Sequence, residues 1–150
     1  MSYFIGLECK TTEHNVLKFL FTSLGVNDYD WIISEDEVIL QNHRYLLSKH
    51  PNINEFNQFI TNEQFVIIFI NVQGYKKNSM KSNVNLVSYQ DFMKSACEII
   101  VLISDGYLVE IYCKDRDVLR LFAANLKKSG CKDIKYKTLE NDGRTKLSVV

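Results

Sequence analysis

Apolar residues at alternating and helical spacings divide the first quarter of the chain into a strand and a helix. Residues 3–9 alternate between an apolar face and a mixed face, which predicts a strand. Thr11 and Thr12 suit the N-cap of a following helix, and Gly25 suits its end. The apolar positions that keep helical spacing between these limits are Val16, Leu17, Leu20, Phe21 and Leu24.

Two short β-rich pieces follow, at residues 28–34 and 38–41, with the acidic run 35–37 between them. We expect a hairpin with this run at its turn and Trp31 near the middle of the first strand. Residues 42–62 are polar, and their apolar positions indicate one or two short helices separated at Pro51.

The centre of the chain contains two apolar runs that do not alternate, at residues 65–72 and 98–104, and these predict strands buried on both faces. Between them, residues 74–87 have a loop-like composition, which is typical of either a mobile segment or a functional one. Ser88 and Asp91 form a capping-box pattern that opens a short helix through about Ala96.

The last third of the chain repeats the order strand, helix, hairpin. Residues 107–113 alternate like residues 3–9, and Asp115 or Asp117 can cap a helix that ends at residues 129–130. A final hairpin turns at residues 141–143 and returns with Leu147 and Val149. In its first strand, Ile134, Tyr136 and Thr138 face one way, and Lys135 and Lys137 face the other.

An internal repeat is the most informative pattern. Residues 3–10 align with 107–114, and residues 16–20 align with 118–122, although any two amphipathic strand-helix units look similar. We therefore expect one α+β domain over residues 1–150, with strand-helix-strand-strand (βαββ) units at 1–41 and 105–150. A helix-strand-helix-strand insertion at 42–104 lies between them, and the sheet is mostly antiparallel or mixed and covered by helices.

Composition indicates an ordinary globular chain. It has 150 residues, 46% of them hydrophobic, and 18 Lys and Arg balance 18 Asp and Glu. Four cysteines without a CxxC pair, no leader pattern, and no apolar run near the roughly 20 residues of a membrane span predict a reduced cytoplasmic protein.

The usual motifs of catalysis and cofactor binding are absent from the sequence. The six glycines are isolated, which disfavours phosphate-binding loops, and His14, His43 and His50 follow no metal-ligand spacing. We expect no metal, no cofactor and no enzymatic activity. An enzyme whose Cys/His or carboxylate site assembles only in space remains a third reading.

Two of the cysteines bear on that reading. Cys9 points with the apolar face of its strand, as a buried structural thiol would. Cys131 follows a helix C-terminus, where we expect the helix dipole to raise its pKa.

Charge is distributed unevenly. Residues 1–75 contain four Lys and Arg against nine Asp and Glu, a net charge of −5, and residues 76–150 contain fourteen against nine, a net charge of +5. The candidate binding residues on the acidic hairpin are Asp28, Asp30, Trp31 and Glu35. Those on the loop 74–87 are Tyr75, Lys76 and Lys77. The basic C-terminal candidates are Arg116, Arg120, Lys135 and Lys137, beside Tyr112.

Residues 104–117, 140–149 and 28–33, with the acidic run that follows the last of these, resemble a family of small uncharacterised bacterial proteins, a domain of unknown function. The resemblance implies a bacterial cytoplasmic origin and no assigned activity.

These patterns favour a non-enzymatic accessory module that binds another protein through the acidic hairpin or the basic C-terminal face. An immunity or antitoxin-like inhibitor is one form of it. We do not expect a membrane as partner, because the apolar runs are short, nor nucleic acid, because stacking aromatics are not interleaved with the lysines. The alternative is a small-molecule sensor with its ligand between the repeats, near Trp31, Tyr107 and Tyr112.

Overall fold

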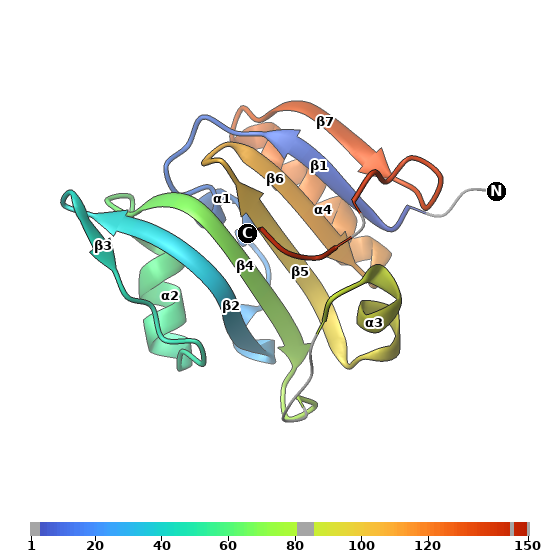
Figure 1. Cartoon of the computed structure of the whole chain (residues 1–150), viewed down its shortest axis with the longest axis horizontal. Coiled ribbons are helices and arrows are strands. Elements are labelled where there is room, and N and C mark those ends of the chain that lie inside the picture. The colour runs from blue at the N-terminus through green and yellow to red at the C-terminus, as the bar shows by residue number, and fades with distance from the viewer. Residues whose placement is uncertain (1–3, 81–85, 145, 150) are drawn as a thin grey trace.

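The computed structural model describes residues 4–80, 86–144 and 146–149. Over these ranges the chain forms a seven-stranded antiparallel sheet, in the order β3-β2-β4-β5-β6-β1-β7, with four α-helices (Figure 1). The strands are β1 (Gly6–Lys10), β2 (Tyr29–Leu40), β3 (His43–Tyr45), β4 (Val66–Lys76), β5 (Cys97–Ser104), β6 (Leu108–Cys113) and β7 (Lys132–Lys137). The helices are α1 (Leu17–Leu20), α2 (Ile53–Thr61), α3 (Tyr89–Lys94) and α4 (Arg116–Lys128), with a 3-10 turn at Val26–Asp28. The α+β class predicted from the sequence is confirmed.

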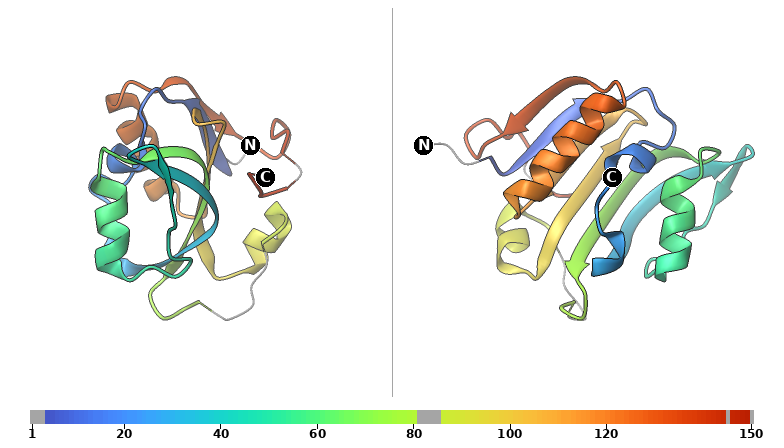
Figure 2. Two further views of the ribbon diagram at one scale, coloured as in Figure 1. Left: turned by 60° about the vertical axis from the view of Figure 1, so that its left-hand side comes forward. Right: turned by 180° about the vertical axis from the view of Figure 1, so that it is seen from behind.

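One face of the sheet, the helix face, is covered by α1, α2 and α4 (Figure 2). The main core lies there, because alternate residues of each strand point toward these helices. Trp31 is buried in it and stacks on Phe56 of α2, with 4.6 Å between ring centroids. Aromatic pairs of this kind contribute about 1 kcal/mol beyond the area they bury.

The opposite face carries α3 and the last described residues, 146–149, which we call the tail (Figure 1). We name this side the tail face. Its smaller core includes Tyr75, Phe92, Tyr112 and Leu147, all buried. The sheet therefore has a packed layer on both sides, the thinner one being built from α3 and irregular chain.

Capping predicted from the sequence is confirmed at two helices and is wrong at the first, because α1 covers only Leu17–Leu20 and neither Thr11 nor Thr12 caps it. The Asp115 carboxylate accepts hydrogen bonds from the first turn of α4, and Ser88 and Asp91 form a reciprocal capping box at α3. A second capping box, formed by Asn52 and Glu55, opens α2 directly after Pro51.

The acidic run 35–37 was wrongly predicted to be a turn. It lies inside β2, which pairs with β4 from Tyr29 to Ile39 through two register shifts. The first shift leaves Ser34 of β2 unpaired and the second leaves Ile68 of β4 unpaired, while residues 35–37 stay in register with β4, so the strand continues. The turn lies at Gln41 and Asn42, whose φ values of 52° and 66° suit a tight hairpin into β3.

The chain does not repeat in the predicted way over the described residues. The equivalent strands β1 and β6 are antiparallel neighbours, with Leu7 opposite Ile111. However, α1 has four residues and α4 has thirteen, and β2 pairs with β4 at one side of the sheet whereas β7 pairs with β1 at the other.

The limits of two further predictions also differ. Strand β4 continues through Gly74 to Lys76, because β2 and β5 pair with both of its edges there. The predicted return strand of the last hairpin is instead the tail, which crosses the tail face, and the Leu147 amide donates to the Val87 carbonyl. The predicted loop 74–87 lies partly outside the described residues, at 81–85.

Candidate functional site

A polar row crosses the tail face from β2 to β7. Its members stand directly opposite one another on neighbouring strands, so their side chains share one face. In strand order they are Glu35, Asn71, Glu110, Glu8 and Lys135, with the apolar Leu102 of β5 between Asn71 and Glu110. Glu8 and Lys135 pair with each other, and the end of the chain supplies partners for Glu35 and Glu110.

A buried ionic cluster occupies the β6 to β7 end of this row. The Lys137 ammonium lies 2.5 Å from a Glu110 oxygen and 3.0 Å from an Asp142 oxygen, and Tyr112 donates to Asp142 at 2.7 Å. The Arg144 guanidinium contacts the other Glu110 oxygen at 2.5 Å. Lys137 and Glu110 are 4% and 5% exposed, so each charge is neutralised inside the protein rather than by water.

This arrangement shifts the pKa values of the charged groups in the cluster. Burial disfavours the ionised Glu110 carboxylate, but hydrogen bonds from Arg144 and Lys137 outweigh burial and lower its pKa below the usual value. The Asp142 pKa is also lowered, since hydrogen bonds from Tyr112 and Lys137 outweigh its burial. The Arg144 pKa is raised, chiefly by the hydrogen bonds to Glu110. These groups are therefore charged at neutral pH and hold one another in place.

The tail closes the other end of the row. Glu35 accepts hydrogen bonds from the Ser148 hydroxyl at 2.9 Å and from the Val149 amide at 3.2 Å. Asn71 donates to the Leu147 carbonyl at 3.1 Å, and Arg144 donates to the Lys146 carbonyl at 3.1 Å. The row thus binds a segment of its own chain, and its polar groups serve the fold.

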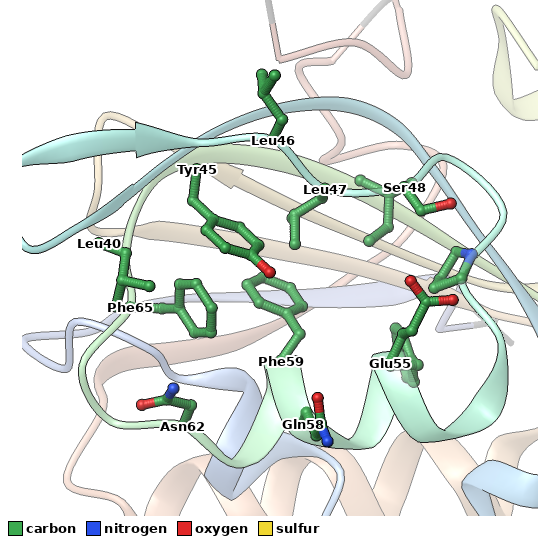
Figure 3. Close-up of a pocket in the computed structure, with 13 residues that line it drawn as sticks. Leu40, Tyr45, Leu46, Leu47, Ser48, Glu55, Gln58, Phe59, Asn62 and Phe65 are labelled. Carbon is green, nitrogen blue, oxygen red and sulfur yellow. The ribbon is translucent and has the colours of Figure 1, made fainter.

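A separate apolar pocket of about 240 Å³ lies between the chain after β3 and helix α2 (Figure 3). We call it the β3–α2 pocket. Figure 3 shows Tyr45 pointing inward toward Phe59 and Leu46 pointing away from the cavity. The pocket is lined by Ile33, Leu40, Tyr45, Leu46, Leu47, Ser48, Pro51, Glu55, Phe56, Gln58, Phe59, Asn62 and Phe65.

Local sequence explains why this pocket is held open. The Asn52–Glu55 capping box fixes the start of α2, and Phe56, Phe59 and Ile60 bury one side of that helix against the sheet. On the far wall, the Lys49 carbonyl accepts from the Ile33 amide of β2 at 2.9 Å. Rigid walls on both sides leave the space between them unfilled.

The predicted acidic surface is not a separate acidic face. Asp30 stands opposite Tyr75, and its carboxylate accepts from the Asn78 amide at 2.9 Å. The Lys77 amide donates to the Asp28 carbonyl, and Lys76 lies 3.6 Å from Glu98. Asp28 and Asp30 therefore share one end of the sheet with the basic loop candidates, where their charges offset each other, whereas Glu35 lies in the polar row and holds the tail.

The predicted basic face is also divided, because Arg116 and Arg120 lie on α4 over the helix face, whereas Lys135 lies in the polar row of the tail face. Arg120 pairs with Asp117, and Lys135 pairs with Glu8 at 3.2 Å. Lys137 was expected on an outer surface and is buried instead, because Arg144 and Asp142 fold over it.

The aromatic residues proposed for a shared ligand site lie apart. Trp31 packs in the helix-face core and Tyr112 in the tail-face core, and Tyr107 is 47% exposed. Tyr75 is fully buried and donates to Gln73. The three aromatic residues therefore do not surround one another, and a ligand site between the repeats stays a prediction.

The predictions for the two cysteines differ in outcome. Cys9 is buried in the helix-face core, as predicted. The pKa of Cys131 is lowered to about 6 and not raised, because hydrogen bonds from the Cys9, Ser129 and Thr11 side chains outweigh its burial.

Sequence reasoning missed the pocket and the ionic cluster, although each left a signal. Leu46 and Leu47 form an apolar pair inside an otherwise polar stretch. Glu110 interrupts an apolar strand and stands opposite Leu102 of β5. A carboxylate at such a position indicates a buried partner of opposite charge. Arg144 belongs to a turn-like segment and gave no such signal.

The comparisons with known proteins give a family and no activity. The family model described as protein of unknown function (DUF2691) matches residues 4–148. The chain belongs to this family. It is also 33% identical over 94 residues to YncE, an uncharacterised protein of Bacillus subtilis (strain 168). The match covers 63% of this chain, and the chain spans 60% of the length of that relative.

No solved structure is significantly similar to the chain. Within the described residues, none of the helices has the length and apolar character that crossing a bilayer requires.

Proposed function

We propose that this protein is a non-enzymatic binding module that holds a partner protein by inserting one large apolar side chain of the partner into the β3–α2 pocket. An inhibitor that neutralises its partner, in the manner of an immunity protein or an antitoxin, is one form of such a module. The observation that carries the proposal is a preformed pocket, most of whose lining residues are apolar in type, with exposed apolar side chains beside it.

The size of the pocket favours a side chain over a free ligand. Sites for small molecules and cofactors usually enclose about 300–1,000 Å³. The 240 Å³ of this pocket falls below that range and suits a single leucine or aromatic group. Partner proteins commonly anchor in this way, with one buried apolar or aromatic residue surrounded by weaker contacts.

The mouth of the pocket supports the same reading. Leu46 is 80% exposed, the largest exposed fraction among the large apolar side chains described, and Tyr45 beside it is 42% exposed. Water at such a surface is released when a partner covers it, which supplies a driving force. Glu55, Gln58 and Asn62 along α2 provide a polar rim for hydrogen bonds to the partner backbone.

The two surfaces favoured by charge alone provide weaker support. Asp28 and Asp30 lie beside Lys76 and Lys77, and the basic residues are split between two faces of the sheet. Neither set forms a continuous field of one sign that would steer a partner.

A titration with capped amino acids tests the pocket. N-acetyl amides of leucine, phenylalanine and tryptophan are added to ¹⁵N-labelled protein while amide resonances are followed by NMR, with N-acetylglycinamide as control. We expect saturable shifts at Leu47, Glu55 and Phe59 with the apolar probes and none with glycine. Shifts confined to other parts of the molecule, or no shifts, would contradict the proposal.

A further inference from the structure

Strand β3 forms one edge of the sheet, beside the β3–α2 pocket. It pairs with β2 along one side, and Figure 1 shows no strand beyond its other side. All the residues of β3 are exposed. An exposed edge strand offers its free backbone N–H and C=O groups to another extended chain.

The exposed edge continues past the end of β3. Residues 43–49, which we call the edge segment, contact β2 again at Lys49, whose carbonyl accepts from the Ile33 amide at 2.9 Å. Within the described parts of the chain, the backbone amides of residues 46–48 donate to no other group. The edge segment therefore provides a stretch of unpaired backbone that is longer than β3 itself.

The strand at the other edge, β7, is less suited to pairing. Asp133 in β7 has a φ of 56°, and the pairing of β1 with β7 shifts register between Glu8 and Lys10. Lysines are frequent in its sequence, Lys-Asp-Ile-Lys-Tyr-Lys. Irregular backbone and lysines protect an edge from adding a further strand, whereas the pairing of β2 with β3 has no register shift.

A strand added beside the edge segment would pass the mouth of the pocket. Tyr45 points into the pocket (Figure 3), and a residue directly opposite Tyr45 on an added strand lies on the same face. An apolar side chain at that position can therefore enter the pocket. The rest of the added strand gains backbone hydrogen bonds, which is how edge strands bind extended peptides.

Charge indicates what the neighbouring position of the added strand contains. The residue opposite Arg44 lies on the other face of the sheet, because side chains alternate along a strand. The Arg44 guanidinium donates to the Asp36 carbonyl at 3.1 Å, which is an uncharged acceptor. The edge segment contains Arg44 and Lys49 and no acidic residue. An acidic side chain opposite Arg44 is therefore favoured.

The same charge disfavours a second copy of this chain as the added strand. The antiparallel register that uses the whole of β3 would pair His43 of each copy with Tyr45 of the other, and Arg44 with Arg44. Like charges directly opposite each other destabilise a strand pair.

We propose that the partner binds as an extended strand antiparallel to the edge segment, with an apolar side chain opposite Tyr45 entering the β3–α2 pocket and an acidic residue next to it opposite Arg44. This inference rests on the proposed function, because it uses the same pocket, and it adds the conformation and sequence of the partner segment.

A backbone-methylated peptide series tests the strand pairing. The probe is the capped hexapeptide acetyl-Thr-Val-Leu-Glu-Val-Thr-amide, and its dissociation constant is measured by NMR titration of the ¹⁵N-labelled protein. Two further peptides carry an N-methyl group on the leucine or on the glutamate nitrogen. Successive amides of a strand point to opposite edges, so only one of these two nitrogens faces the edge segment. We expect one methylated peptide to bind about tenfold more weakly than the probe, and the other to bind within about threefold of it.

The outcomes separate this inference from the proposed function. If both methylated peptides bind like the probe and replacing its leucine with glycine abolishes binding, the pocket binds a side chain without strand pairing, and the inference is wrong. If the glycine peptide binds like the probe but one methyl group still weakens binding, strand pairing holds and the pocket is not the anchor, which contradicts the proposed function. A probe that does not bind, although N-acetyl leucine amide does, overturns the inference alone.

A charge exchange tests the acidic position. Arg44→Glu should weaken binding of the probe about threefold and strengthen binding of the peptide with lysine in place of glutamate by a similar factor. Lys132→Glu makes the same change of charge on β7 and should alter neither affinity. Equal effects of the two variants, or an Arg44→Glu protein that weakens both peptides alike, would contradict an acidic partner residue opposite Arg44.

Discussion

The Lys137 ammonium lies 2.5 Å from Glu110 in a part of the molecule where both side chains are less than one tenth exposed. Replacing Lys137 with alanine leaves Asp142 without its cation and Glu110 with Arg144 alone. Removing one partner of a buried pair costs about 3–5 kcal/mol of unfolding free energy, so we expect a loss of about 3 kcal/mol in urea denaturation.

Lys135→Ala is the matched control for that substitution. Lys135 lies on the same strand and pairs with Glu8, but its side chain is 69% exposed. An exposed pair contributes less than about 1 kcal/mol. Equal losses in the two variants would show that the buried cluster does not stabilise the fold.

Acid should lower the stability of the folded protein by protonating carboxylates of the same cluster. The pKa values of Glu110 and Asp142 are lowered in the folded state, so their contribution is present above the unfolded values of about 4 and is lost as pH falls through the folded values. We expect the urea midpoint to fall steeply below about pH 4, and to fall less in Glu110→Gln, which has one fewer of these groups. A midpoint that falls equally in both proteins would contradict this.

The packing of Trp31 depends on the absence of a side chain at Gly74. A Cβ at residue 74 would lie 2.6 Å from the Trp31 ring, which also stacks on Phe56. We expect Gly74→Ala to cost about 1–3 kcal/mol and to shift the Trp31 fluorescence, because the ring has to move within a filled core. Gly143→Ala is the control, since a Cβ there meets nothing within 4 Å. Equal stability of the two variants would contradict this description of the core.

Glu35 should control how firmly the tail is held. Its carboxylate binds the Ser148 hydroxyl and the Val149 amide, and hydrogen bonds to charged groups contribute about 1.5–3 kcal/mol. We therefore expect Glu35→Ala to speed hydrogen exchange of the Val149 amide by about tenfold or more. Glu37→Ala, two residues along β2, should leave that rate unchanged. Similar rates in the two variants would mean that the tail is held by other contacts.

Local signals in the sequence predicted local structure well. Asp115, and Ser88 with Asp91, marked helix starts because a cap acts within one turn of the chain. The acidic run 35–37 was wrongly predicted to be a turn, because pairing with the distant strand β4 keeps it extended. The alternation of residues 134–138 predicted that Lys137 lies on the solvent face of its strand. No local pattern showed that residues 142–144 would cover that face.

The β3–α2 pocket could not be predicted either, since its walls come together only when β2 binds the chain after β3. The sequence shows that Tyr45, Leu47 and Phe59 are apolar, and only tertiary packing makes their side chains surround a cavity. The charge imbalance between the two halves of the sequence was real, but the fold places Asp28 and Asp30 of the acidic half beside Lys76 and Lys77 of the basic half.

The central claim is tested most directly by native mass spectrometry of the protein isolated gently from the cells that produce it. Three versions are compared: the wild type, the double variant Tyr45→Ser with Leu46→Ser, and Leu139→Ser, which changes another exposed leucine away from the pocket. We predict a co-purifying protein that the wild type and Leu139→Ser retain and the double variant loses. A partner retained equally by all three, or a bound small molecule in place of a protein, would contradict the proposed function.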